Sequence, residues 1–163
     1  MIRAAILTVS DSCALGKRED ISGQTIEDIL SKDKFQICEK RIVPDERDAI
    51  ANELIYFSDK AGFDLVFTTG GTGLGPRDVT PEATISVCER IVPGLTEVMR
   101  AEGFRNKPAF GGPNAILSRG MAGIRKNTLV INLPGSPKAV AECLELIVAV
   151  LPHAVEMMLG GGH

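Results

Sequence analysis

The most regular feature of the chain is a set of short, largely apolar runs. They cover residues 4–9, the core of 64-DLVFTTGG-71 and the core of 128-TLVINLPG-135. Runs that do not alternate with polar residues, are rich in β-branched side chains and end at polar residues, Gly or Pro are typical of strands buried on both faces of a parallel sheet. A shorter run at residues 40–43 predicts a fourth strand.

The segments between these runs carry the period of helices. The expected helices cover residues 22–31, 45–61, 80–91 and 93–104, and a last one begins at Ser136. Apolar side chains recur on one face of these segments, as Val140, Leu144 and Ile147 do in the last. Strands that alternate with helices predict a three-layer α/β/α sandwich on a mostly parallel sheet, in a single domain over residues 1–163.

Several residues mark the expected helix boundaries. Thr80 followed by proline is the pattern of an N-cap with proline in the first turn. Gly62 is a candidate C-terminal cap of the helix over residues 45–61. Pro152 is expected to end or kink the last helix, because proline removes a backbone donor and clashes with the preceding turn.

The segment 105–127 breaks this rhythm. It reads as a loop rich in Gly and Pro, followed by a short strand over residues 115–118. We expect this strand to lie at the edge of the sheet and to pair antiparallel with residues 128–133. A loop of this length inside a compact domain is usually functional or mobile.

Composition and charge narrow the functional classes. The net charge is −3 and the pI about 5.4, so no overall positive field draws the chain to nucleic acid or to an anionic membrane. The chain has no Trp and few aromatic residues, which argues against a nucleic-acid surface built on stacking. An anionic ligand would therefore be held by local groups.

The four cysteines and the apolar runs bear on the compartment. The cysteines are scattered without any C-x-x-C pair, which indicates free, mostly buried thiols in a reducing compartment. The first apolar run is too short for a secretory signal, and no run approaches the ~20 apolar residues that cross a bilayer. We therefore expect a cytoplasmic protein.

The stretch 68-TTGGTGLGPRDVTPEAT-84 is the strongest candidate site. Its glycines follow an expected parallel strand, and ligands of open α/β sheets bind beyond such strand ends. Glycine lets backbone N–H groups approach a phosphate, and the start of the next helix favours an anion. Neither the P-loop nor the dinucleotide pattern is satisfied. The alternative is a tight turn; the phosphate-binding candidates are Thr69, Gly70, Gly71, Thr72, Gly73 and Arg77.

Two aspartates follow expected strands at the same rim of the sheet. Asp45 ends 42-IVPDE-46 and Asp78 ends the glycine-rich stretch. Two carboxylates at one rim could hold Mg²⁺ against bound phosphates, because magnesium binds a few carboxylates together with phosphate oxygens. For Asp45 the alternative is an N-cap, since it follows proline and precedes a helix.

Three further groups belong to this rim. In 10-SDSC-13 and 20-DISG-23 the hydroxyls could bind phosphate or cap a helix, and spacing does not choose between the two. In 134-PGSPK-138 the choice is again between capping and a ligand, with Lys138 unfavourable in a first helical turn. Arg119, next to Ser118, could hold a phosphate through two hydrogen bonds.

Together these segments carry a resemblance. The run 66-VFTTGGTGLGPRD-78 with 79-VTPEAT-84 resembles the signature of the molybdenum-cofactor biosynthesis family. Further matches follow in the family's order, in 7-LTVSDS-12, 42-IVPDE-46, 116-ILSR-119, 123-GIRK-126 and 130-VINLPGSPKAVAECLE-145. Within that family the set is similar to the molybdopterin adenylyltransferases, a type also seen as the G domains of gephyrin and its plant counterpart.

The resemblance implies a molybdopterin-binding domain, a homotrimer and an enzyme, with ATP as co-substrate and Mg²⁺ as cofactor. The reaction it implies is adenylation of the terminal phosphate of molybdopterin with release of pyrophosphate, followed by hand-off to a molybdate-inserting enzyme. Asp45 and Asp78 match the family's functional aspartates and are the expected catalytic and metal-binding residues. The glycine loop and Arg77 would hold the nucleotide. The residues expected around molybdopterin are Ser10, Asp11, Ser118, Arg119, Pro134, Gly135, Ser136 and Lys138.

Three other functions stay open at this point. A carrier or accessory protein of the same superfamily would bind molybdopterin with little adenylation, against which the presence of both aspartates argues. A scaffold would use the trimer to organise a larger assembly. A regulator that binds nucleotide would explain the glycine loop alone and none of the other matched segments.

Overall fold

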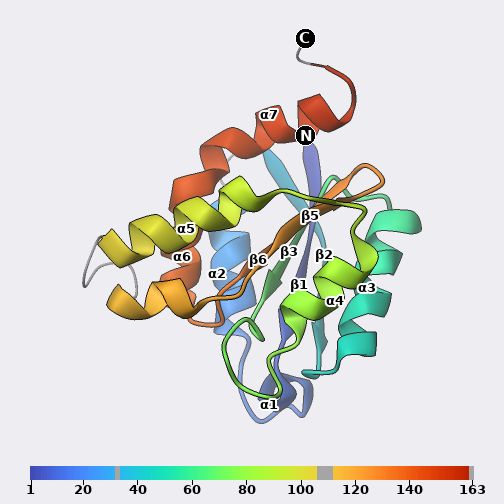
Figure 1. Cartoon of the computed structure of the whole chain (residues 1–163). Helices are drawn as coiled ribbons and strands as arrows, with labels where there is room; N and C mark the ends of the chain where they lie inside the picture. The colour runs from blue at the N-terminus through green and yellow to red at the C-terminus, as the bar shows by residue number, and fades with distance from the viewer. Residues whose placement is uncertain (32–33, 106–111, 162–163) are drawn as a thin grey trace.

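The computed structural model describes residues 1–31, 34–105 and 112–161. Its centre is a six-stranded sheet in the order β2-β1-β3-β6-β5-β4 (Figure 1). The strands are β1 (Ile2–Val9), β2 (Phe35–Val43), β3 (Leu65–Thr69), β4 (Arg90–Ile91), β5 (Ala122–Arg125) and β6 (Thr128–Leu133). The pairs β2–β1, β1–β3 and β3–β6 are parallel, whereas β5 runs antiparallel to both of its neighbours. The predicted mostly parallel sheet with an antiparallel edge is confirmed.

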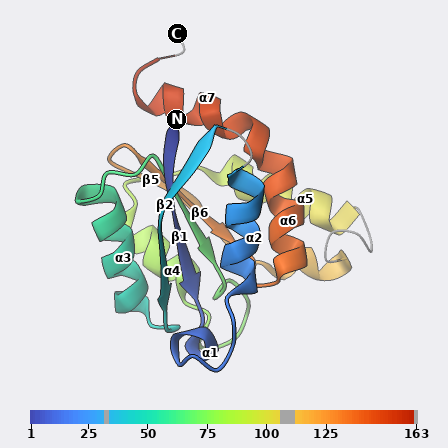
Figure 2. The same ribbon diagram turned by 180° about the vertical axis from the view of Figure 1, so that it is seen from behind.

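Helices cover both faces of the sheet. Figures 1 and 2 show α3 and α4 on one side and α2, α5 and α6 on the other. The helices are α1 (Asp11–Ala14), α2 (Ile21–Leu30), α3 (Arg47–Asp59), α4 (Thr80–Val87), α5 (Pro93–Arg105), α6 (Pro137–Ile147) and α7 (Leu151–Met158), with 3₁₀ turns η1 (Gly112–Leu117) and η2 (Val148–Val150). The three-layer sandwich predicted from the sequence is thus confirmed.

The central strands bury both of their faces. In β1, Ala4 and Ile6 belong to the core beneath α2 and α6, while Ala5 and Leu7 belong to the core beneath α3. All four side chains are fully buried. This explains why the run reads as continuously apolar, because alternate residues enter different cores and both cores are apolar.

The predicted edge strand over residues 115–118 is wrong. Those residues lie in the 3₁₀ turn η1 and its exit, and the strand that pairs with β6 is β5 (Ala122–Arg125). The turn leaves Ile116 and Leu117 about half exposed, so their apolar character does not reflect a place in the sheet. The tight hairpin between β5 and β6 passes through Lys126, whose φ is 51°. The Gly- and Pro-rich loop expected before the edge strand falls mostly on residues 106–111, outside the described residues.

Other helix boundaries shift for local reasons. The helix expected over residues 80–91 ends at Val87, and Arg90–Ile91 forms β4. Thr80 lies inside the helix and not at the N-cap; its hydroxyl donates a hydrogen bond to the Gly70 carbonyl at 2.9 Å. Pro152 lies in the first turn of α7, after the chain has changed direction through η2.

Strand β2 is longer than predicted, because it begins at Phe35 and not at Lys40. It lies at the edge of the sheet, and its side chains alternate in exposure. An edge strand with one solvated face has polar residues at every second position, so its first half carries no continuous apolar run.

Candidate active site

The candidate residues converge because the parallel strands all end at the same edge of the sheet, near α1 (Figure 1). The backbone itself joins these ends. The Ser10 N–H donates to the Val43 carbonyl at 2.9 Å, and the Thr69 hydroxyl donates to the Pro134 carbonyl at 2.7 Å. The loops after β1, β2, β3 and β6 therefore meet at one rim, as the sequence predicted.

The glycine loop turns sharply where it leaves β3. Gly70 and Gly71 have φ values of 96° and 65°, a region that side chains disfavour. A Cβ on Gly70 would lie 2.2 Å from the Val9 carbonyl oxygen, and one on Gly71 would lie 2.3 Å from Oγ1 of Thr80. Glycine is needed here because the loop is pressed against β1 and against the start of α4.

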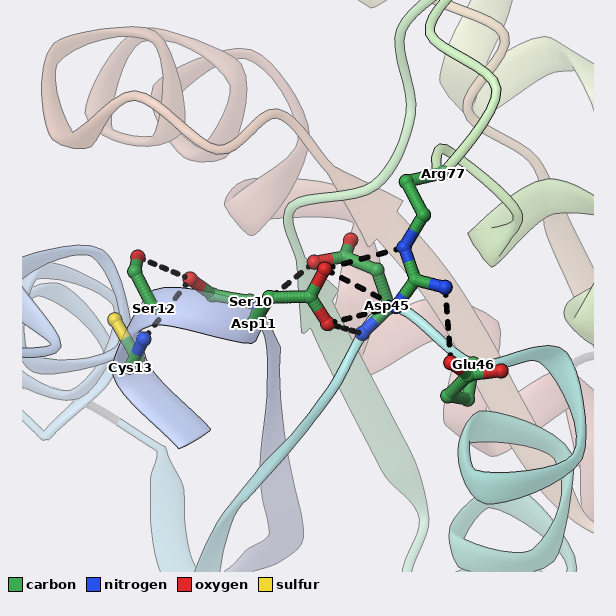
Figure 3. Close-up of polar contacts among 7 residues, drawn as sticks. All are labelled: Ser10, Asp11, Ser12, Cys13, Asp45, Glu46 and Arg77. Carbon is green, nitrogen blue, oxygen red and sulfur yellow. Dashed lines mark hydrogen bonds and ion pairs between the residues drawn. The ribbon is translucent and has the colours of Figure 1, made fainter. Parts of the chain in front are cut away.

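Two aspartates hold each other's backbone at the centre of the rim (Figure 3). The Asp11 N–H donates to Oδ2 of Asp45 at 2.8 Å, and the Asp45 N–H donates to Oδ1 of Asp11 at 2.9 Å. Helix α3 begins two residues after Asp45, with Glu46 at the N-cap position. Asp45 is therefore not the helix cap that the sequence left open, and its carboxylate ties the end of β2 to α1.

Arg77 joins this pair from the glycine loop. Its Nη2 lies 2.9 Å from Oδ1 and 3.1 Å from Oδ2 of Asp11, and its Nη1 donates to Oε1 of Glu46 at 2.9 Å. The guanidinium thus fastens the loop to α1 and to the start of α3. Both of its terminal nitrogens are engaged by carboxylates of the chain itself.

The two aspartates differ in their protonation equilibria. Hydrogen bonds from Arg77 lower the pKa of Asp11 below its ordinary value. Burial raises the pKa of Asp45, with repulsion from Asp11 and Asp78 adding to the shift. A cation beside Asp45 would offset both effects, since it would favour the charged form.

Asp78 presents the second carboxylate expected to bind metal. Its Oδ2 accepts from the Gly75 N–H at 2.8 Å. Among the described residues no hydrogen bond reaches Oδ1 of Asp78 or Oδ1 of Asp45, so each has an oxygen available as a ligand. The described part of the chain holds no cluster of three or more His, Cys, Asp and Glu side chains suited to a metal. The donor set therefore fits Mg²⁺ only where a substrate supplies further oxygens.

Arg119 clamps the glycine loop. Its backbone N–H donates to the Thr72 carbonyl at 2.8 Å. In its side chain, Nε donates to the Gly73 carbonyl at 2.8 Å and Nη2 donates to the Asp78 carbonyl at 2.6 Å. Its Nη1 forms an ion pair with Glu82. Because these bonds occupy the guanidinium, the structure brings Arg119 to the loop and not into an open position for a phosphate.

Two cavities open on either side of Gly135 and Ser136, which line both. The larger encloses about 690 Å³ and the smaller about 350 Å³. Of the predicted site residues, the larger is also lined by Gly71, Thr72, Gly73, Asp78, Ser118 and Pro134, and the smaller by Ser10, Thr69 and Gly70. Residues expected at the nucleotide and residues expected at the pterin are thus mixed in both cavities.

The remaining predicted residues lie outside these cavities. Asp11, Asp45, Arg77 and Arg119 line neither cavity, and Lys138 lies on the surface with its side chain 69% exposed. The Lys138 amine is 4.0 Å from Oε1 of Glu142, one turn along α6. Ser136 is a helix cap, since its hydroxyl accepts from the Ala139 N–H at 3.4 Å.

Sequence reasoning missed the helix cap that orders the smaller cavity. Asp20 caps α2 by accepting from the Gly23 N–H at 2.8 Å, and its other oxygen accepts from the Thr8 hydroxyl at 2.6 Å. An acidic residue before the start of a helix is a signal that could have identified this cap.

It also missed a buried polar residue in the wall of the larger cavity. Asn132 donates to the hydroxyls of Thr68 and Thr84, both at 2.9 Å, and accepts from the Met121 N–H at 3.0 Å. A lone asparagine inside an apolar strand run is a visible signal for such a network.

Comparison with known proteins decides the family. A family model described as "Probable molybdopterin binding domain" matches residues 5–153. The chain belongs to this family. The resemblance seen in the sequence motifs is thereby confirmed.

Similar proteins cover the chain almost completely. The chain is 45% identical over 161 residues to the molybdopterin adenylyltransferase of Helicobacter pylori strain J99, and the alignment covers 98% of the chain and 89% of that protein. It is 39% identical over 147 residues to the molybdopterin adenylyltransferase of Escherichia coli K12, and this alignment covers 88% of the chain and 72% of that protein. The crystal structure of the molybdopterin biosynthesis enzyme MoaB from Thermus thermophilus superposes with a TM-score of 0.90 at 47% identity over 98% of each chain.

Two further observations concern the cysteines and the apolar character of the helices. All four cysteines are free, with Cys38 exposed and the other three half-buried, so the prediction of mostly buried thiols holds only in part. Burial raises the pKa of Cys88 to about 11 and that of Cys143 to about 12, which keeps both protonated at neutral pH. Across the described residues, no helix has the length and apolar character that crossing a bilayer requires.

Proposed function

We propose that the chain is a molybdopterin adenylyltransferase that uses ATP and Mg²⁺. The observation that carries this is the pair of cavities that share Gly135 and Ser136 beside the glycine loop, because a transfer between two substrates needs two adjoining sites. The names of the similar bacterial proteins support the same reaction.

The reaction balances without a protein nucleophile. An oxygen of the terminal phosphate of molybdopterin attacks the α-phosphorus of ATP, the bond from that phosphorus to the bridging oxygen breaks, and pyrophosphate leaves. Catalysis of this kind depends on alignment and on neutralising charge. When bound, Mg²⁺ would supply that charge, held by the free oxygens of Asp45 and Asp78.

The other residues of the rim have supporting and binding parts in this proposal. Arg77 and Arg119 hold the glycine loop in shape. In this proposal the backbone N–H groups of the loop would bind the phosphates. Ser10, Ser118 and Ser136 would contact the substrates in this proposal, because these residues line the cavities. Lys138 and Asp11 lie outside both cavities; we propose that Asp11 acts through its bonds to Asp45 and Arg77.

Three wider statements rest on the family resemblance. We propose a homotrimer, hand-off of the adenylated product to a molybdate-inserting enzyme, and a cytoplasmic location. The free thiols support the last, because a reducing compartment leaves cysteines unpaired.

The test is the complete reaction with purified protein. Molybdopterin, ATP and Mg²⁺ are mixed, and both pyrophosphate and adenylated pterin are measured. We expect product only with the metal, and turnover at least about 100-fold lower in Asp45→Asn and in Asp78→Asn, because the loss of metal-borne charge stabilisation costs this much or more. Asp28→Asn, at an exposed position of α2, removes the same charge as a control.

Two outcomes would overturn the proposal. Pterin binding without product, from folded protein and verified substrate, would indicate a carrier. Turnover near the wild-type level in both aspartate variants would remove the metal role from these residues.

A further inference from the structure

The larger cavity contains one cationic side chain among the described residues that line it. Arg100, on α5, faces the cavity together with two acidic residues, Asp78 and Glu142. The Glu142 carboxylate lies 4.0 Å from the amine of Lys138. In the proposed function, the Asp78 carboxylate binds the metal. Arg100 is thus the charge that an anionic group in this cavity would meet.

The guanidinium of Arg100 is held in place by neutral acceptors. Nη1 donates to the Gly120 carbonyl at 3.0 Å and to the Ser118 carbonyl at 3.4 Å, and Nη2 donates to the Thr96 hydroxyl at 3.3 Å. The acceptors of these hydrogen bonds lie in its own helix and in the segment after η1. The group is therefore fixed in orientation before any ligand arrives.

Arg100 differs in its partners from the other arginines of the site. Arg77 is paired with Asp11 and Glu46, and Arg119 with Glu82. Within the described residues no carboxylate lies within ion-pair distance of Arg100. A half-buried guanidinium without a counter-ion is costly unless something else supplies the negative charge.

We propose that Arg100 binds a phosphate group of the substrate in the larger cavity and determines its preference for a phosphorylated ligand. Planar guanidinium groups match phosphate oxygens well, and a charge-assisted bond in a partly enclosed site discriminates strongly against uncharged analogues. The inference deepens the proposed function. The phosphate belongs either to molybdopterin or to ATP, and the experiment separates these sources.

Equilibrium titration of the whole protein with molybdopterin and, separately, with ATP tests this. The variants are Arg100→Gln, which removes the charge, and Arg100→Lys, which keeps it. We expect Arg100→Gln to raise the Kd of one ligand at least tenfold, equal to about 1.4 kcal/mol, with less than a twofold change for the other. Arg100→Lys should recover part of this loss, because lysine restores the charge without the planar geometry of the guanidinium. The affected ligand identifies the source of the phosphate.

The matched control is Arg105→Gln, on the same helix. Arg105 is 72% exposed and pairs with Glu102, so its loss removes the same charge away from the cavity and should leave both Kd values unchanged. A purely structural role for Arg100 predicts a lower Tm and equal defects in the Gln and Lys variants, and either that pattern or unchanged Kd values would overturn the inference. Wild-type protein that binds without turnover would refute the adenylyltransferase proposal while leaving this test intact.

Discussion

At the residue scale, the ionised form of Asp45 that would bind the metal is also the form that burial disfavours. Its carboxylate accepts one backbone hydrogen bond, yet burial and the charges of Asp11 and Asp78 raise its pKa. A group whose folded pKa is raised binds its proton more tightly in the native state. Its ionised form therefore lowers the free energy of unfolding as pH rises through the ordinary value of 3.8 and beyond.

Asp45→Asn should therefore not destabilise the fold at neutral pH. Asparagine keeps an oxygen to accept from the Asp11 N–H while removing the unfavourable charge. We expect a Tm at pH 7 equal to or above that of the wild type, with the difference shrinking as pH falls through the raised pKa of Asp45 towards 3.8 and disappearing below 3.8. Thermal melts from pH 3 to pH 8 measure this. A Tm lowered at pH 7 by more than about 2 °C would show that the charge stabilises the structure.

The aspartates of the site could be predicted from the sequence, but the partners of its arginines could not. Asp45 and Asp78 each follow an expected strand at the same rim of the sheet. Arg77, by contrast, meets Asp11 across 66 positions of sequence, and Arg119 meets Glu82 across 37. An arginine in such a motif suggests a phosphate ligand. Only the folded chain shows that its guanidinium is already paired with carboxylates of the chain itself.

At the scale of elements, the glycine loop is built by its neighbours. β1 presses on it at Gly70, the start of α4 presses at Gly71, and Arg119 holds its carbonyls from the other side. The sequence predicted the strand and the helix on either side because both carry strong patterns. It missed β5 and η1, where short segments with Gly and exposed apolar residues give no clear period.

Gly70→Ala should be strongly destabilising. The new Cβ would lie 2.2 Å from the Val9 carbonyl oxygen, at a φ of 96° that alanine disfavours. We expect the free energy of unfolding in urea to fall by about 2–4 kcal/mol.

The matched control is Gly94→Ala in α5, where an added Cβ meets nothing within 4 Å. Alanine there should be neutral or stabilising by up to about 1 kcal/mol. Equal losses in the two variants would show that close approach at Gly70 is not the cause.

At the scale of the whole molecule, the two faces of the sheet bury separate cores, yet some apolar side chains remain outside both. Ile85 on α4, Ile91 on β4 and Val98 on α5 are 50%, 42% and 38% exposed. These three elements follow one another in the chain, and β4, which carries Ile91, is the two-residue strand at the edge of the sheet. An exposed apolar side chain on an edge strand, such as Ile91, marks a surface suited to burial against other copies of the chain.

We therefore expect the proposed trimer to involve this surface. Light scattering after size exclusion should give a mass of about three times 17.4 kDa. Ile91→Lys should shift the protein towards the mass of a single chain, because a lysine on an edge strand opposes association. A wild-type protein that elutes as a single chain at micromolar concentration would contradict the trimer.

The wall that the two cavities share has a consequence for the fate of the product. A molecule assembled from both ligands can keep contacts in each cavity while losing its freedom of movement only once. Such a molecule should remain bound longer than either of the parts from which it was made. The enzyme would then shelter a labile intermediate from water until a receiving protein arrives, and residence time would matter as much as the speed of bond formation.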